Sequence, residues 1–129
     1  MSYNDRCNVS ELLGKTLTSV RKVDSEEIYF EATDGSQYKM FHSQDCCESV
    51  VIEDICGELQ DLVGSPLLIA EEVSNEPEPK FPNDYTPESY TWTFYKFATA
   101  NGYVTIRWLG ESNGYYSESV DFERTQAAA

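Results

Sequence analysis

Basic residues are scarce in this sequence. Nine Lys and Arg stand against 23 Asp and Glu, which gives a formal net charge of −14 at neutral pH. A surface of this charge repels phosphate backbones, so we expect no direct binding of nucleic acid. Residues 43–90 hold 12 acidic residues and one basic residue, Lys80, and so contribute −11. This charge indicates either a need for solubility alone or an acidic surface that faces a basic partner.

Long hydrophobic runs are also absent. The longest, residues 66–70, has the length of a strand and falls far below the roughly 18 residues of a membrane span. Residues 1–10 are polar, so we expect neither a signal peptide nor a membrane partner. A chain of 129 residues with 40% hydrophobic residues can bury one core. We therefore expect one globular domain over residues 1–126, with residues 127–129 as a cloning scar.

Cysteines are few, and their spacing matches no framework of disulfide bonds. The chain has four, of which Cys46 and Cys47 are adjacent and Cys7 and Cys56 stand alone. Without a signal peptide we expect a reducing compartment. All four cysteines are therefore predicted to be reduced thiols.

The segment around the adjacent cysteines carries side chains that could hold a metal or act as a nucleophile. They are His42, Asp45, Cys46, Cys47 and Glu48. No spacing here matches a zinc pattern, since adjacent cysteines of an extended chain point apart and no second pair follows. We expect no metal and no cofactor, and we favour a structural role for the thiols. A metal site, or a Cys–His nucleophile oriented by Asp45, stays open as an alternative.

Two Gly-containing turns predict β-hairpins. Asp34-Gly35 lies between the strand-like residues 28–33 and 37–42, and Asn101-Gly102 lies between 90–100 and 103–109. Two-residue loops at these turns fix the pairing of the strands. The expected cross-strand pairs are Tyr29–Met40 and Ile28–Phe41 in the first hairpin, and Ala100–Tyr103, Phe97–Ile106, Tyr95–Trp108, Lys96–Arg107 and Phe94–Leu109 in the second.

The remaining elements complete an α+β domain that leans towards β. Residues 8–13 and 54–63 have the spacing of short helices, and residues 49–52 fit a strand or a helix start. Residues 17–23, 67–73 and 115–122 read as strands, and the proline-rich residues 74–88 as a long surface loop. We expect a mostly antiparallel sheet of about six strands with one or two short helices.

The second hairpin suggests an anion site. Lys96 and Arg107 are predicted to face each other, and like charges directly across two strands repel. One explanation is that acids from elsewhere in the chain pair with them. The other is a bound phosphate or carboxylate, which the Arg fork suits. Asn113, Tyr115 and Tyr116 follow, and an exposed tyrosine there fits stacking on a base or a subunit contact.

Two blocks of the sequence resemble a family of small phage-encoded proteins of unknown function. The first includes Asp45-Cys46-Cys47-Glu48 and the second Ser112-Asn113-Gly114-Tyr115-Tyr116. The likeness covers roughly residues 11–123, and the matching stretches are residues 42–48, 52–55, 61–64, 70–72, 105–108 and 112–117. A weaker resemblance, in the β-rich core and the stretch after Arg107, is to the Thoeris anti-defence sponge proteins. Those proteins are oligomers that sequester cyclic-nucleotide-type signals without cleaving them.

The resemblance implies a phage accessory protein that acts in the host cytoplasm. Our first hypothesis is a non-enzymatic counter-defence protein that sequesters a phosphate-bearing signal through Lys96, Arg107, Asn113, Tyr115 and Tyr116. The alternative is an acidic inhibitor that mimics nucleic acid and binds a basic surface of a host or defence protein, as anti-CRISPR proteins do. An enzyme that uses Cys46 or Cys47 is a third hypothesis. The aromatic residues of the last third also predict a homo-oligomer.

Overall fold

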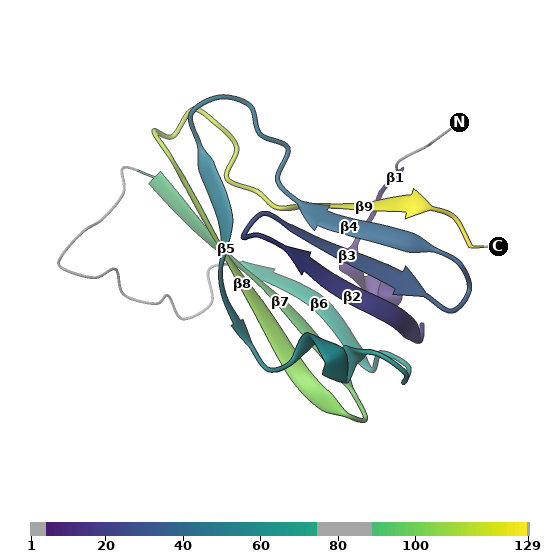
Figure 1. Cartoon of the computed structure of the whole chain (residues 1–129). Coiled ribbons are helices and arrows are strands. Elements are labelled where there is room, and N and C mark those ends of the chain that lie inside the picture. Colours follow the sequence, from purple (N-terminus) through teal and green to yellow (C-terminus); the bar gives the residue numbers. More distant parts are fainter. Residues whose placement is uncertain (1–4, 75–88, 129) are drawn as a thin grey trace.

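Two antiparallel β-sheets pack against each other in the computed structural model, which describes residues 5–74 and 89–128 (Figure 1). The first sheet has five strands in the order β1-β9-β4-β3-β2, and the second has four in the order β5-β8-β7-β6. None of the helical segments in this described part is long and apolar enough to cross a membrane. The predicted loop 74–88 lies almost wholly outside the described residues.

The elements follow one another along the chain as strands with two short 3-10 turns. They are β1 (Asp5–Arg6), η1 (Val9–Leu12), β2 (Leu17–Val23), β3 (Glu27–Ala32), β4 (Gln37–Phe41), β5 (Ser49–Cys56), η2 (Leu59–Leu62), β6 (Ile69–Ser74), β7 (Ser89–Thr99), β8 (Gly102–Ser112) and β9 (Asp121–Gln126). The expected antiparallel β-structure is confirmed. The α+β class is not, because the described residues contain no α-helix.

The prediction of a helix over residues 54–63 is wrong, because this stretch contains the end of β5 and the 3-10 turn η2. β5 extends to Cys56 and buries Val50 and Ile52 with the alternation of a strand. Gly57 follows with φ +102°, and an added Cβ there would lie 2.4 Å from the Tyr103 carbonyl oxygen. The strand therefore ends at a position that only glycine fits.

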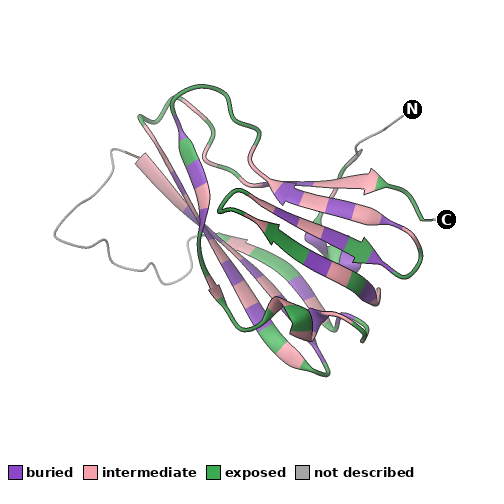
Figure 2. Ribbon diagram, in the orientation of Figure 1, coloured by how far each residue is buried: buried purple, intermediate pink, exposed green. Residues whose placement is uncertain are grey.

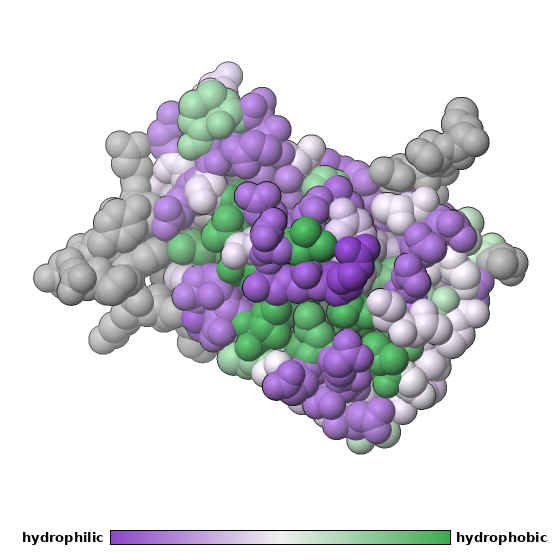
Figure 3. Space-filling model, viewed as in Figure 1, coloured by the Kyte–Doolittle hydropathy of each residue, from purple (hydrophilic) through white to green (hydrophobic). Residues whose placement is uncertain are grey.

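The core lies between the two sheets, as the buried residues in Figure 2 show. Phe30 of the first sheet packs against Phe97 of the second with ring centroids 5.8 Å apart. The Trp108 indole donates to the Met40 sulfur at 3.3 Å, and the Trp108 side chain is fully buried. At one side of the sandwich, apolar side chains gather between β2 and the β5–η2 stretch (Figure 3), where Ile55, Leu59 and Val63 pack on the core.

The first hairpin has a longer loop than expected. Tyr29 pairs with Lys39 and Ile28 with Met40, one residue away from the predicted register. The Asp34 carboxylate accepts hydrogen bonds from the backbone N–H and hydroxyl of Ser36, at 2.9 and 2.5 Å. These bonds close a three-residue loop with Gly35 at φ +89°.

The second hairpin is shifted by two residues, so its side chains keep the expected faces but change partners. Thr99 pairs with Gly102, which makes Ala100-Asn101 the loop. The Thr99 hydroxyl donates to the Asp61 carbonyl at 2.5 Å and accepts from the Asn101 N–H at 3.1 Å. Gly102 is the first residue of β8, and the Asp61 side chain lies so close to it that an added Cβ would be 2.7 Å from a carboxylate oxygen.

This shift changes every cross-strand pair that the sequence predicted in the second hairpin. Phe97 pairs with Val104, Tyr95 with Ile106, Phe94 with Arg107 and Lys96 with Thr105. The predicted strand 115–122 also differs, since β9 begins only at Asp121. Residues 113–120 instead form an irregular connection between the two sheets.

Candidate functional site

Two segments that are far apart in the sequence run together at one end of the molecule, at the top of Figure 1. They are residues 42–48, which follow β4, and residues 112–120, which begin with the last residue of β8. The imidazole Nδ1 of His42 lies 2.7 Å from the Ser119 carbonyl oxygen, and the Ser43 N–H donates to the Asp121 carboxylate at 2.9 Å. We call this region, with the hollows beside it, the acidic end.

Glu48 organises the first segment. Its carboxylate accepts from the backbone N–H of Asp45 at 2.8 Å and of Cys46 at 2.9 Å, and it pairs with the His42 Nε2 at 2.7 Å. The hydrogen bond from His42, with those backbone bonds, lowers the pKa of Glu48 to about 2. Both ring nitrogens of His42 thus lie within hydrogen-bond distance of oxygen atoms, Nδ1 of the Ser119 carbonyl and Nε2 of the Glu48 carboxylate.

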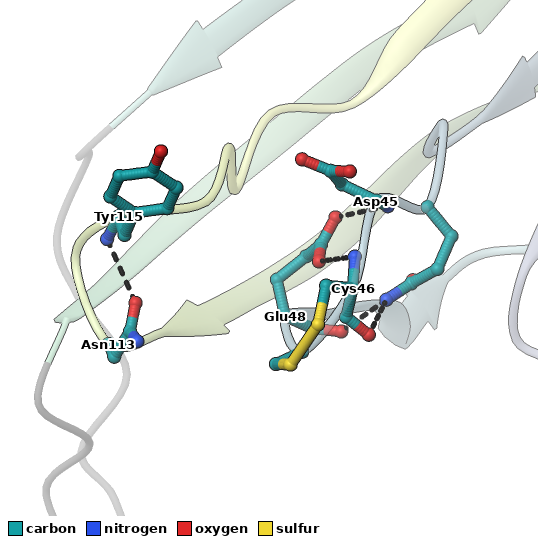
Figure 4. Close-up of a disulfide and its surroundings, with 7 residues drawn as sticks. Asp45, Cys46, Glu48, Asn113 and Tyr115 are labelled. Atoms are coloured by element: carbon teal, nitrogen blue, oxygen red, sulfur yellow. Dashed lines mark hydrogen bonds between the residues drawn. A yellow bond between two sulfur atoms is a disulfide. The ribbon is translucent and has the colours of Figure 1, made fainter.

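The two adjacent cysteines form a disulfide bond, which corrects the expectation of four reduced thiols (Figure 4). The expectation rested on spacing that matches no disulfide framework and on the expected absence of a signal peptide. The Glu48 carboxylate instead draws two consecutive N–H groups together, so Cys46 and Cys47 sit in a tight turn. Cys7 and Cys56 are free, and burial raises the pKa of the Cys7 thiol to about 12.

The candidate metal ligands are engaged with one another. His42 pairs with Glu48, and the Cys46 sulfur is bonded to Cys47. Within residues 5–74 and 89–128, no three His, Cys, Asp or Glu side chains are arranged around a common metal position.

Asn113, Tyr115 and Tyr116 belong to the second segment. The Tyr115 N–H donates to the Asn113 side chain at 3.0 Å, which makes an Asx turn, and Gly114 has φ +92° (Figure 4). Tyr115 is 84% exposed, whereas Tyr116 is partly buried and meets the Tyr115 ring edge-on with centroids 5.0 Å apart.

The first hollow of the acidic end has a volume of about 370 Å³ and lies between the end of β6, the start of β7 and the second segment. Its lining residues are Glu72, Ser74, Ser89, Thr91, Thr93, Gly114, Tyr116, Ser117, Glu118, Ser119 and Val120. The Glu72 carboxylate accepts from the Tyr95 hydroxyl at 2.6 Å. Burial and this carboxylate raise the pKa of Tyr95, so its proton stays in the hydrogen bond.

Glu118 is held in the first hollow by hydroxyl groups. Its carboxylate accepts from Thr91 at 2.8 Å and from Ser112 at 2.5 Å. Partial burial raises the pKa of Glu118, but hydrogen bonds from Ser112, Ser89 and Thr91 outweigh it and leave the pKa below its ordinary value. Glu118 is therefore ionised at neutral pH.

The second hollow, of about 330 Å³, lies on the other side of the first segment. It is lined by Glu26, His42, Gln44, Glu48, Ser49, Val50 and Val51. Neither hollow has a Lys or Arg among its described lining residues. Both hollows therefore present carboxylates, and the His42 ring, which lines the second hollow, is already paired with Glu48.

Lys96 and Arg107 lie elsewhere, on the outer face of the four-stranded sheet. The Arg107 guanidinium pairs with Glu53, from the bulge in β5, and lies 3.7 Å from Asp54. Lys96 is opposite Thr105 on one side and Glu71 on the other. Arg107 is five residues before Ser112, about 17 Å along an extended strand. The structure thus brings Asn113, Tyr115 and Tyr116 together but not with the two cations.

The hollow residues Glu72, Thr91 and Glu118 were missed by sequence reasoning. One signal was present, since Ser89, Thr91 and Thr93 alternate on the face of β7 that continues into Tyr95. Three hydroxyls on an inward-facing strand surface need polar partners. Nothing in the sequence placed Glu118 in the hollow, because its position depends on the irregular path of residues 113–120.

The chain matches a family model over most of its length. Residues 10–122 match a domain of unknown function (DUF7448), so the chain belongs to this family. No curated protein and no solved structure matches. Both sequence blocks of the acidic end lie within the matched residues.

Proposed function

We propose that this DUF7448 chain is a non-enzymatic binding protein that engages a basic surface of a partner protein through its acidic end. In our reading it is a phage counter-defence protein that acts in the host cytoplasm as a nucleic-acid mimic. The observation that carries this proposal is the lining of the two hollows, where Glu26, Glu48, Glu72 and Glu118 occur without a described Lys or Arg. A basic partner surface complements such a charge pattern.

A binding measurement with a basic peptide tests this proposal. Fluorescence anisotropy with labelled nona-arginine should give binding that weakens as salt increases, since ionic contacts are screened. The triple variant Glu26→Gln, Glu72→Gln, Glu118→Gln should lose at least tenfold in affinity. The matched control Glu53→Gln, Asp54→Asn, Glu58→Gln removes the same charge elsewhere and should lose less than about threefold. Equal losses would mean that net charge alone attracts the peptide and would overturn the proposal.

Sequestration of a phosphate-bearing signal is the second candidate. The exposed Tyr115 beside Asn113 favours it, because an exposed ring can stack on a base. The ion pairs of Arg107 with Glu53 and Asp54 weigh against it, since they occupy the cation that would bind phosphate. A panel of cyclic nucleotides in a thermal-shift assay decides between the candidates. A rise in melting temperature that Tyr115→Ala removes would favour the signal ligand.

Self-association is a separate part of the proposal. The outer face of the four-stranded sheet carries Val51, Tyr90, Phe94, Tyr103 and Leu109, and Tyr103 is 52% exposed. A second copy that covers this face would leave the acidic end open. Light scattering at micromolar concentration and moderate salt should give at least a dimer mass, and a monomer mass would contradict this part.

A further inference from the structure

We infer that the first hollow of the acidic end is a receptor for a guanidinium or alkylammonium group, presented as an Arg or Lys side chain of the basic partner. This inference rests on the proposed function and names the chemical group that the partner inserts. The hollow of about 370 Å³ falls in the size range of sites that take small organic groups.

The hydrogen bonds in the first hollow leave acceptors towards its interior. A hydroxyl has a single proton, and those of Thr91 and Ser112 are donated to Glu118 while that of Tyr95 is donated to Glu72. The lone pairs of the lining Thr91 hydroxyl and the second oxygen of Glu72 remain. A ligand that donates hydrogen bonds therefore finds acceptors in the hollow.

One further hydroxyl of the first hollow, that of Thr93, has no hydrogen-bond partner among the described residues. Thr93 lines the hollow and is 5% exposed, and its hydroxyl hydrogen-bonds to no other described residue. The Thr93 hydroxyl oxygen is not among the fully buried atoms that lack a partner, so it opens on the hollow, where a ligand can hydrogen-bond to it. Thr93 therefore offers a ligand in the hollow a polar contact that is not a carboxylate.

The negative charge of the first hollow favours hydrogen-bond donors that are cations. Glu72 and Glu118 lie in the lining without a described Lys or Arg, which repels phosphate and favours a cation. A guanidinium is planar, carries five N–H donors and no acceptor, and can bond to a carboxylate through two parallel hydrogen bonds. Tyr116 also lines the hollow and offers a ring against which a cation can pack.

Calorimetric titration with N-acetyl-arginine amide tests the inference. We expect millimolar binding to the wild-type chain and none of the neutral isostere N-acetyl-citrulline amide, which replaces the guanidinium with a urea group. Glu118→Gln should lower the affinity for the arginine probe at least tenfold, and Thr91→Val should lower it at least threefold. The control Glu58→Gln, an exposed acid on the turn before η2, should leave binding unchanged.

Three outcomes would overturn the inference: no binding of the arginine probe, equal binding of both probes, or equal weakening by Glu118→Gln and Glu58→Gln. Circular dichroism establishes that each variant is folded, and Glu72→Gln replaces Glu118→Gln if the latter unfolds. If the arginine probe fails while nona-arginine still depends on the triple variant, the inference is wrong and the proposed function stands. If both fail, both are wrong.

Discussion

Carboxylates on the two faces of the four-stranded sheet have different partners. On the outer face, Glu53 and Asp54 face the guanidinium of Arg107. At the acidic end, Glu72 and Glu118 accept hydrogen bonds from hydroxyl groups. A guanidinium cancels negative charge, whereas a hydroxyl orients a carboxylate and leaves its charge intact. The charge of Glu72 and Glu118 therefore remains available to a ligand, while the single guanidinium of Arg107 offsets part of the charge of Glu53 and Asp54.

The largest effect on stability is expected from Glu48, the most buried carboxylate of the acidic end. Glu48→Gln leaves His42 buried without a carboxylate and weakens the bonds to the turn at Cys46. We expect this variant to lose more free energy of unfolding than any other single substitution at the acidic end, measured by urea denaturation. Glu58→Gln is the control. A variant as stable as the wild type would show that the His42–Glu48 pair does not hold the end together.

Acid should reproduce this effect in the wild-type protein. The pKa of Glu48 in the folded protein, about 2, lies below its ordinary value of 4.5. Ionised Glu48 therefore stabilises the fold above about pH 4.5, and this contribution is lost as the pH falls towards 2. Urea denaturation from pH 6 to pH 3 should show a steeper loss in the wild type than in Glu48→Gln. Parallel profiles would contradict the low pKa.

Arg107→Ala should have a moderate effect on stability and little effect on binding. It removes the pairs with Glu53 and Asp54 and the contact of the guanidinium with the Trp92 ring, 5.5 Å away. We expect a loss of about 1 kcal/mol in the free energy of unfolding, as for partly exposed ion pairs. Affinity for nona-arginine should stay within about twofold. A tenfold change in that affinity would remove the distinction between the two faces.

Glu118→Gln should have the reverse profile. The amide oxygen still accepts from Thr91 or Ser112, and the change reduces the net negative charge from −14 to −13. We expect a change in the free energy of unfolding below about 1 kcal/mol, together with the loss of affinity described above. A loss larger than that of Arg107→Ala, with affinity unchanged, would make Glu118 a structural residue.

The sequence predicted the strands well and their pairing poorly. Alternation and β-branched residues located most strands, because each depends on local side chains. The two hairpin registers depended on bonds that local sequence does not show. In the first, Asp34 binds Ser36, and in the second, Thr99 reaches Asp61 across the fold. A two-residue shift was enough to separate Lys96 from Arg107.

The sequence indicated both segments of the acidic end. It did not indicate that the two segments lie together and form one site. Both blocks with the family resemblance, around Cys46 and Tyr115, lie in it. Their proximity follows from the pairing of β5 with β8, where Ser49 faces Glu111, and from the bond between His42 and Ser119. Such long-range pairing is a property of the whole sheet. A single sequence therefore indicates the residues without their arrangement.

The most direct test of the central claim is a map of where a basic peptide binds. Amide chemical shifts of the ¹⁵N-labelled protein, followed during titration with nona-arginine, report the contact residues. Our account expects the shifts to concentrate at residues 42–49, 72–74, 89–93 and 112–120. Shifts that concentrate at residues 53–58 and 107, or that spread evenly over the acidic residues of both faces, would contradict it.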